Sequence, residues 1–206
     1  MYKDRKEAGE KLAEHLKKYT EENAVLLAIP RGGVPVAYAV GKILNLPIDV
    51  IVVKKIGHPH NPEFAIGAAS VNSTYINPDN IFGVTESYIE EQKMKKQVEA
   101  KNTYKELRGD QLPVDLSGKT AILIDDGVAT GSTIRMAVTV TRNLGADKVI
   151  VAIPVGSPRA VEMLREVADE VICPLQPSLF HAIGQFYSDF SQVPTQTVKE
   201  MLMNYS

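Results

Sequence analysis

The sequence predicts an α/β fold in which a mostly parallel central sheet is flanked by helices and carries a small hood or helical appendage. Short continuous apolar runs, typical of strands buried on both faces, alternate with stretches of helical periodicity. Such strand–helix–strand connections join parallel strands. The length of 206 residues and the apolar content of 44% suit a single domain over residues 1–206 with one full core.

Charge and composition narrow the classes of partner. The formal net charge is -2 at pH 7, so no overall basic field draws the chain to nucleic acid or to an anionic membrane. The most apolar region, residues 34–53, is interrupted by Lys42, Pro47 and Asp49 and does not have the pattern of a membrane span. The charged opening "MYKDRKEAGEKL" lacks the apolar core of a signal peptide, and the single cysteine permits no internal disulfide. We expect a cytoplasmic protein without a nucleic-acid or membrane partner.

The first part of the chain predicts two helices and two strands. Residues 4–19 have apolar positions at helical spacing, and Asp4 with Glu7 is a candidate capping pair for this helix. The run "AVLLAIP" at 24–30 is typical of a strand buried on both faces. A glycine-rich loop then leads into a second helix. The run "IDVIVVKK" at 48–55 predicts the second strand.

The later part of the chain repeats this alternation. The run "TAILIDD" at 120–126 predicts a strand, and a helix from about Ser132 to Leu144 follows, with Gly145 at its end. The runs "KVIVAIPV" and "DEVIC" predict two further strands around a helix near residues 158–167. Because strands and helices alternate, we expect the strands to be parallel and covered on both sides.

Three segments lie outside the alternation. Residues 64–77 are rich in small side chains and predict a strand or a hairpin. Residues 86–108 are dense in Lys and Glu, which indicates a solvated helix beside the core, within a helical insertion at about 80–112. The tail at about 174–206 is expected to fold over the sheet and to cover the site. It contains the aromatic residues Phe180, Phe186, Tyr187 and Phe190.

The stretch "ILIDDGVATGST", residues 122–133, combines groups that suit a phosphorylated sugar. It ends a buried strand on two adjacent carboxylates, Asp125 and Asp126, and ligands of open parallel sheets bind beyond the carboxyl ends of strands. Sugar hydroxyls or a cation such as Mg²⁺ would compensate the paired charges. The next residues supply backbone amides, hydroxyls and a helix amino terminus, which favour a phosphate. Gly127 and Gly131 leave room for close approach.

This stretch resembles the 5-phosphoribosyl 1-diphosphate (PRPP) binding motif of type I phosphoribosyltransferases. Both have an apolar strand, two acidic residues, two variable residues, a small residue, Thr-Gly and a hydroxyl pair. The resemblance implies that Asp125 and Asp126 hold the ribose 2- and 3-hydroxyls. A simple acidic cap on a strand would explain Asp126 but not the hydroxyl-rich loop. The implied cradle for the 5-phosphate consists of Gly127, Val128, Ala129, Thr130, Gly131, Ser132 and Thr133.

A second loop, in "IPRGGVPVA", follows the first core strand, where the family places its pyrophosphate loop. Arg31 supplies a cation, and Gly32 with Gly33 supplies backbone amides, which are the groups that pyrophosphate needs. Family members often have a strained or cis peptide bond in this loop. The alternative is a plain Gly-Gly turn beside a surface arginine, because glycine pairs commonly mark turns.

The third stretch that resembles the family is "VVKKIGHPHNPEFAIGA". Lys54 and Lys55 are expected to end a strand, and family members often place a basic pair here, before a flexible loop that closes over the reaction centre and excludes water. Glu63 is a candidate base in that loop by position alone. His58 and His60 are a candidate metal pair, although no cysteine or further ligand cluster accompanies them.

The resemblance covers about residues 24–173, with the three loops in family order, and extends to a subgroup whose acceptor is not assigned from sequence. It implies that a small-molecule acceptor, commonly a base nitrogen, displaces pyrophosphate from C1 of PRPP, a reaction of nucleotide metabolism. Mg²⁺ would be held mostly by PRPP and not by direct protein ligands. The protein would contribute positioning and charge stabilisation. The implied catalytic residues are Asp125, Asp126, Arg31 and Lys55.

Ala129 and the charge pattern bear on the acceptor and on rival functions. Transferases for 6-oxopurines carry an acidic residue at the place of Ala129, so the resemblance disfavours hypoxanthine, guanine and xanthine. The alternative function is a PRPP-binding regulator without transferase activity, but no basic helix-turn-helix or basic tail supports nucleic-acid binding. A protein that merely shares the fold would not need all three loops. The expected partners are therefore PRPP and a small-molecule acceptor, and a homodimer is a candidate assembly.

Overall fold

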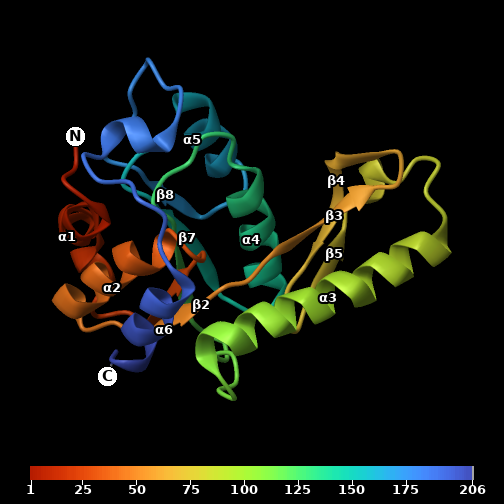
Figure 1. Ribbon diagram of the computed structural model, residues 1–206, viewed down its shortest axis with the longest axis horizontal. Helices are drawn as coiled ribbons and strands as arrows, with labels where there is room; N and C mark the ends of the chain where they lie inside the picture. Colours follow the sequence, from red (N-terminus) through yellow and green to blue (C-terminus); the bar gives the residue numbers. More distant parts are fainter. Residues whose placement is uncertain (206) are drawn as a thin grey trace.

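The computed structural model describes residues 1–205 and consists of a main body and an arm (Figure 1). The body is built on a parallel sheet in the order β2-β1-β6-β7-β8. Its strands are short and largely apolar because helices cover both faces. They are β1 (Ala24–Ala28), β2 (Ile48–Val50), β6 (Thr120–Ile124), β7 (Lys148–Ala152) and β8 (Glu170–Ile172). The predicted α/β fold with a parallel central sheet is confirmed.

Helices on the two faces of the sheet bury two separate cores. Along β1, Leu26 packs into one core and Leu27 into the other, as alternating strand side chains do. The first face is covered by α1 (Arg5–Leu16) with the short helix η1 (Lys17–Tyr19), by α2 (Gly33–Leu44) and by α6 (Thr195–Met203), and the second by α4 (Ser132–Asn143) and α5 (Pro158–Arg165). Asp4 caps α1 by accepting a hydrogen bond from the Glu7 amide at 2.8 Å, which confirms this half of the predicted capping pair.

The strands of the body end together at one edge of the sheet. Ala28 of β1 lies opposite Val50 of β2 and Ile124 of β6, and Ile124 lies opposite Ala152 of β7. The loops that follow β1, β2 and β6 therefore leave the sheet at the same edge, which is where open parallel sheets bind ligands.

The arm is a three-stranded antiparallel sheet with one long helix beside it (Figure 1). Ile56 and Ile66 form a small core of their own with Tyr88 and Ile89 of the helix. The elements of the arm are β3 (Lys54–His58), β4 (Asn61–Ala69), β5 (Thr74–Ile76), the short helix η2 (Pro78–Asn80) and α3 (Glu86–Arg108). Of the two alternatives predicted for residues 64–77, a strand or a hairpin, the structure has the hairpin. The helix predicted at 86–108 is confirmed.

The last turns of α3 are anchored in the body. Tyr104 is buried in the first core, and its hydroxyl donates to Asp49 Oδ2 at 3.0 Å. The same buried carboxylate accepts from the Val114 amide at 2.9 Å and pairs with Arg108 at 3.1 Å. The charge pattern predicts that α3 is a solvated helix. This prediction holds only in part, because one face of the last turns of α3 packs into the core.

The run "IDVIVVKK" forms parts of two strands and not the single strand that its apolar pattern predicts. β2 ends at Val50, and Lys54 begins β3, which pairs with β4 in the arm. Residues 51–53 cross between the two sheets. Both pieces have strand character, so the pattern alone does not reveal the change of partner. Lys54 and Lys55 begin a strand instead of ending one, and the histidine-rich segment after them forms the β3–β4 hairpin.

The amino terminus and the tail pack together over the end of the sheet. The Tyr2 amide donates to Phe186 O at 2.8 Å, and the Ser188 amide donates back to Tyr2 O at 2.8 Å. Tyr2 and Tyr187 are buried there, beside the short helix η3 (Ile183–Phe186). Ser206, the last residue of the predicted tail, lies outside the described residues. Among residues 1–205, no helix is both long and apolar enough to cross a membrane.

Candidate active site

The loops after β1 and β6 lie against each other because their strands are neighbours. A Cβ at Gly33 would stand 2.4 Å from the Ile124 carbonyl oxygen, and one at Gly32 would stand 2.1 Å from Asp126 Oδ2. Side chains do not fit at these distances, so both glycines are required where the loops meet. The Gly33 amide donates to Ile29 O at 3.0 Å, and it is therefore not one of the accessible amides that the sequence suggests.

Arg31 extends from the β1 loop toward the first turn of α6. The peptide bond between Pro30 and Arg31 is cis, a feature that the family resemblance led us to expect. The side chain is exposed, and Nη1 lies 3.5 Å from Thr195 Oγ1. A guanidinium has five N–H donors, so this one contact leaves several for an anionic ligand.

Asp125 and Asp126 have different surroundings although they are adjacent. The Asp125 side chain is half-buried, and its Oδ1 accepts a hydrogen bond from the Asp126 amide at 2.8 Å. Asp126 is 7% exposed, and its Oδ2 accepts from Arg5 Nε at 2.8 Å. The Tyr187 hydroxyl donates to the Asp126 carbonyl oxygen at 2.6 Å. The amino-terminal helix and the tail therefore both hold Asp126, whereas Asp125 is the more accessible of the two.

Arg5 is a residue of this site that sequence reasoning missed. It lies 121 positions before Asp126, within a helix whose charged residues read as an ordinary solvated face. No local pattern distinguishes Arg5 from the other cations of that helix. The contact between Arg5 and Asp126 is revealed only by the packing of α1 beside the carboxyl end of β6.

Burial changes the acidity of both carboxyls. Burial raises the pKa of Asp125 well above its ordinary value, and the adjacent Asp126 charge raises this pKa further. Burial also raises the pKa of Asp126, while the Arg5 guanidinium opposes the rise. A ligand that offers hydroxyl donors or a cation would stabilise the ionised forms, so the pair is suited to such a ligand.

The segment after the acidic pair rests on the loop between β7 and α5. The Val128 amide donates to Val155 O at 2.9 Å, and the Ser157 amide donates to Val128 O at 2.9 Å. The Ser157 hydroxyl donates to Ala129 O at 2.7 Å. Gly127 and Val128 are buried by these contacts, and Ala129 is the first exposed residue of the loop.

The residues that follow present the amino terminus of α4 to solvent. Gly131, with φ of 79°, directly precedes the helix, and Thr130, Ser132 and Thr133 are exposed. The hydrogen bonds found within residues 1–205 include none that is donated by the backbone amides of residues 129–133. These donors and the positive end of the helix dipole are therefore available to an anion.

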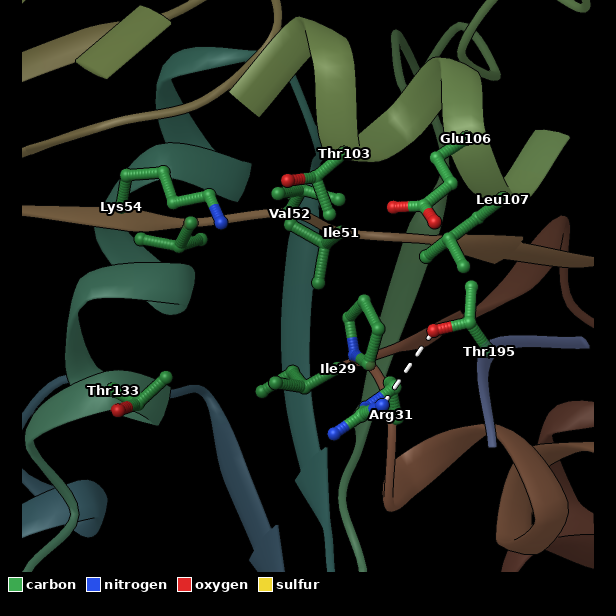
Figure 2. A pocket seen from close by; sticks show the side chains of 12 residues that line it. Ile29, Arg31, Ile51, Val52, Lys54, Thr103, Glu106, Leu107, Thr133 and Thr195 are labelled. Carbon is green, nitrogen blue, oxygen red and sulfur yellow. Dashed lines mark hydrogen bonds between the residues drawn. The ribbon is translucent and has the colours of Figure 1, made fainter. Parts of the chain in front are cut away.

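A cavity of about 360 Å³ lies between the β1 loop, the β2–β3 connection and α3 (Figure 2). Figure 2 shows the Lys54 amine and the Glu106 carboxylate directed into this space, with Arg31 below them. Thr133, from the first turn of α4, also lines it, so the cavity adjoins both predicted anion loops. Sequence motifs do not indicate Glu106 or Thr195. The full lining consists of Ile29, Pro30, Arg31, Ile51, Val52, Val53, Lys54, Thr103, Glu106, Leu107, Thr133 and Thr195.

The predicted basic pair is divided between two places. Lys54 lines the cavity, whereas Lys55 Nζ lies 3.0 Å from Glu63 Oε2 on the neighbouring strand of the arm. His58 and His60 line a second cavity, of about 380 Å³, at the tip of the arm. In the described part of the chain, no three His, Cys, Asp or Glu side chains are grouped so that they could hold a metal ion.

The parallel sheet, its flanking helices and the loops at its carboxyl edge define an α/β protein that binds ligands beyond the carboxyl ends of its strands. The chain belongs to the phosphoribosyl transferase domain family, whose model matches residues 2–191. A solved structure, that of TT1426 from Thermus thermophilus, is similar with a TM-score of 0.92 and 36% sequence identity, and covers 100% of this chain and 99% of that one.

Curated relatives extend the comparison to sequence. Two proteins of Mycobacterium tuberculosis, from strains H37Rv and CDC 1551, are each named "Putative phosphoribosyl transferase" and are 37% identical to this chain over 205 residues. The match covers 98% of this chain and 46% of each relative, so the chain spans about half the length of these relatives. A ribose-phosphate pyrophosphokinase of Pyrococcus furiosus is 38% identical over 60 residues, 28% of this chain and 22% of that protein.

Proposed function

We propose that this chain transfers the 5-phosphoribosyl group of PRPP to a nucleobase acceptor and releases pyrophosphate. The observation that carries the proposal is the arrangement at the carboxyl edge of the sheet. An acidic pair, a helix amino terminus with available amides, and an arginine-bearing loop leave neighbouring strands at the same edge. They would recognise sugar hydroxyls, one phosphate and a second anion, which are the three parts of PRPP.

The sugar and the 5-phosphate would be bound by contiguous residues. The ribose hydroxyls would lie at Asp125 and Asp126, of which Asp125 is the more exposed residue. The 5-phosphate would accept hydrogen bonds from the backbone amides of residues 129–133 and from the hydroxyls of Thr130, Ser132 and Thr133. The dipole of α4 would add to this binding, because its positive end is directed at the phosphate.

The pyrophosphate would lie at the β1 loop. Arg31 and Lys54 line one cavity and would both stabilise the negative charge that collects on the leaving group. Gly32 would allow the loop to pass close to the acidic pair. Lys55 would join this set only after its ion pair with Glu63 opens.

The reaction would be a substitution at C1 of PRPP. A nitrogen of the acceptor forms a bond to C1 while the bond from C1 to the pyrophosphate oxygen breaks, the bonding electrons leave with pyrophosphate, and the proton of that nitrogen passes to water or to the departing pyrophosphate. The sugar ring becomes positively charged in the transition state, and Asp125 and Asp126 would stabilise that charge. Their carboxylate oxygens are hard ligands that suit Mg²⁺, which would be carried mainly by PRPP, reach Asp125 or Asp126 through water, and neutralise pyrophosphate charge.

Ala129 supports an acceptor outside the 6-oxopurines. It is exposed where the acidic residue of 6-oxopurine transferases stands, and a methyl group cannot accept a proton from the base. We therefore propose adenine-type or uracil-type bases as the first acceptors to examine, with hypoxanthine, guanine and xanthine as the bases expected to be poor.

The proposal is tested by following pyrophosphate release when the protein is mixed with PRPP, Mg²⁺ and each base in turn. Release that depends on one base supports transfer and identifies the acceptor. Tight PRPP binding without release for any base would instead support the regulatory alternative. The absence of PRPP binding at about millimolar PRPP would overturn both functions. A dissociation constant of about 1 mM corresponds to a binding free energy of only about 4 kcal/mol, so even weak binding would be detected.

A pair of variants tests the location of the site. Asp125→Asn combined with Asp126→Asn should weaken PRPP binding while the protein stays folded, because the sugar loses its charged acceptors. Asp147→Asn is the matched control: Asp147 is exposed and directly precedes β7, at the opposite edge of the sheet. Unchanged PRPP affinity in the double variant would show that the acidic pair is not the ribose site.

A further inference from the structure

Arg5 is a buried cation at the acidic pair to which the family resemblance assigns no role. Its side chain is 12% exposed, and its Nε lies 2.8 Å from Asp126 Oδ2. The guanidinium carbon lies 4.0 Å from the centroid of the Phe190 ring, and Nη1 donates to Ser191 O at 2.8 Å. The tail thus holds the guanidinium from one side while Asp126 holds it from the other, so its orientation is fixed before any ligand binds.

The Asp126 carboxylate lies between Arg5 and the loop after β1. A Cβ at Gly32 would stand 2.1 Å from Oδ2 and 3.2 Å from Oδ1, so the carboxylate packs directly on the glycine. Among the hydrogen bonds of the described residues, the one that the Asp126 carboxylate accepts is donated to Oδ2 and not to Oδ1. Its Oδ1 therefore keeps its capacity to accept a hydrogen bond from a ligand.

A carboxylate buried to this extent requires a compensating charge. Without one, desolvation favours the protonated form, which loses part of its acceptor capacity. The polar groups that face Asp126 are Arg5 from α1, Asp125 from the same loop and the Tyr187 hydroxyl from the tail. Arg5 is the cation among these three, so it is the group that can compensate the Asp126 charge.

We infer that Arg5 is a positioning residue of the PRPP site, which keeps Asp126 ionised and fixes Oδ2 so that Oδ1 can accept a ribose hydroxyl. This inference rests on the proposed function, because it requires PRPP to bind at Asp126. It makes the amino-terminal helix and the tail part of the substrate site, although neither belongs to the three family loops. PRPP affinity then depends on a side chain that does not touch PRPP.

Three variants of α1 test the role of the guanidinium. Arg5→Met removes the charge at similar length, Arg5→Lys keeps the charge, and Lys6→Met removes a neighbouring exposed charge from the same helix as the matched control. PRPP dissociation constants are measured by calorimetric titration with Mg²⁺ present, and thermal unfolding is measured on the same samples. We expect Arg5→Met to bind PRPP about 10- to 100-fold more weakly, Arg5→Lys to recover part of the loss, and Lys6→Met to equal the wild type.

A double-variant cycle separates positioning from a purely structural role. If Arg5 acts through Asp126, Arg5→Met will cause little further loss of PRPP affinity when Asp126→Asn is already present. Losses that simply multiply would overturn the inference, as would wild-type affinity in Arg5→Met. Should Arg5→Met fail to fold, Arg5→Gln, which retains hydrogen-bond donors, is tested in the same cycle against the same outcomes.

The outcome for the wild type separates this inference from the proposed function. If the wild type does not bind PRPP, the proposed function fails, and the role inferred for Arg5 fails with it. If the wild type binds PRPP and the Arg5 variants bind equally well, only the role of Arg5 is rejected.

Discussion

Gly32 lies so close to Asp126 that a Cβ at Gly32 would stand 2.1 Å from Asp126 Oδ2. The φ angle of Gly32 is -59°, which suits any residue, so glycine is required here for space and not for backbone conformation. The contact joins the loop after β1 to the loop after β6. Displacement of one of these loops will therefore disturb the other.

Gly32→Ala should lower both stability and PRPP affinity, because the new methyl group must displace the Asp126 carboxylate or the loop. We expect a loss of about 1–3 kcal/mol in the free energy of unfolding, typical of overpacking. Urea unfolding and calorimetric PRPP titration measure the two effects. Gly118→Ala is the control: with φ of 69° and open space around it, this substitution costs stability far from the loops. Equal PRPP affinities in the two variants would contradict the prediction.

Asp125→Asn should change how stability depends on pH. Burial and the Asp126 charge raise the pKa of Asp125 in the folded state, so the folded protein binds this proton more tightly than the unfolded chain does. The ligand-free wild type therefore loses stability as the pH rises through the folded-state pKa, and Asp125→Asn lacks this loss. The free energy of unfolding of the variant, relative to wild type, should increase between about pH 4, near the unfolded pKa, and about pH 8.

Urea unfolding at several pH values measures this difference in the free energy of unfolding. Asp147→Asn, at an exposed position, is the control and is measured over the same pH range. A constant difference for Asp125→Asn would mean that the Asp125 carboxyl does not titrate differently in the folded and unfolded states.

Lys54→Met should raise the KM for PRPP more than Lys55→Met does. Lys54 lines the cavity beside Arg31, whereas Lys55 pairs with Glu63 on the arm. Loss of one charge-assisted contact to pyrophosphate corresponds to about 1.5–3 kcal/mol, or roughly 10- to 150-fold. Steady-state kinetics with varied PRPP compare the two variants, each of which removes one charge from the same strand. A larger effect of Lys55→Met would show that the arm changes its pairing when PRPP binds.

Asp49→Ala should destabilise the protein by about 3 kcal/mol, because it leaves Arg108 without its buried carboxylate and removes the acceptor for Tyr104. Glu99→Ala is the control on α3, the helix that carries Tyr104 and Arg108. Glu99 pairs with Lys96 at 2.9 Å on the partly exposed surface, and its loss should change stability by no more than about 0.5 kcal/mol. Chemical unfolding of both variants measures the difference, and similar values for the two would contradict the anchoring of α3 by Asp49.

Much of the fold could be predicted from the sequence because its signals are local. The strand predicted at 120–126 is β6, and the helix predicted from about Ser132 begins at that residue. The helix at 86–108 has its predicted bounds as well. Continuous apolar runs, capping residues and glycine at a helix end each act within a few residues, so they can be read without knowledge of the tertiary structure.

Strand pairing could not be predicted in the same way. The run at 48–55 has strand character along its apolar positions, yet the chain leaves the central sheet after Val50 and joins the arm at Lys54. β2 pairs with β1 in the central sheet, whereas β3 pairs with β4, the strand that directly follows it in the chain. Both pieces have strand character, so the residue pattern does not show that the chain changes sheets between them. The division of Lys54 and Lys55 between the cavity and the arm follows from that pairing.

The order of strand, acidic pair, loop and helix at residues 122–133 follows from local sequence, because contiguous residues need only local backbone geometry to bring carboxylates and amides to one place. The difference between the two carboxylates arises from long-range packing. Asp126 is held by Arg5, which is 121 residues distant in the chain, and Asp125 is left more accessible. An ion pair between distant segments forms only where packing brings them together, and here the packing of α1 and the tail brings a cation to a buried carboxylate.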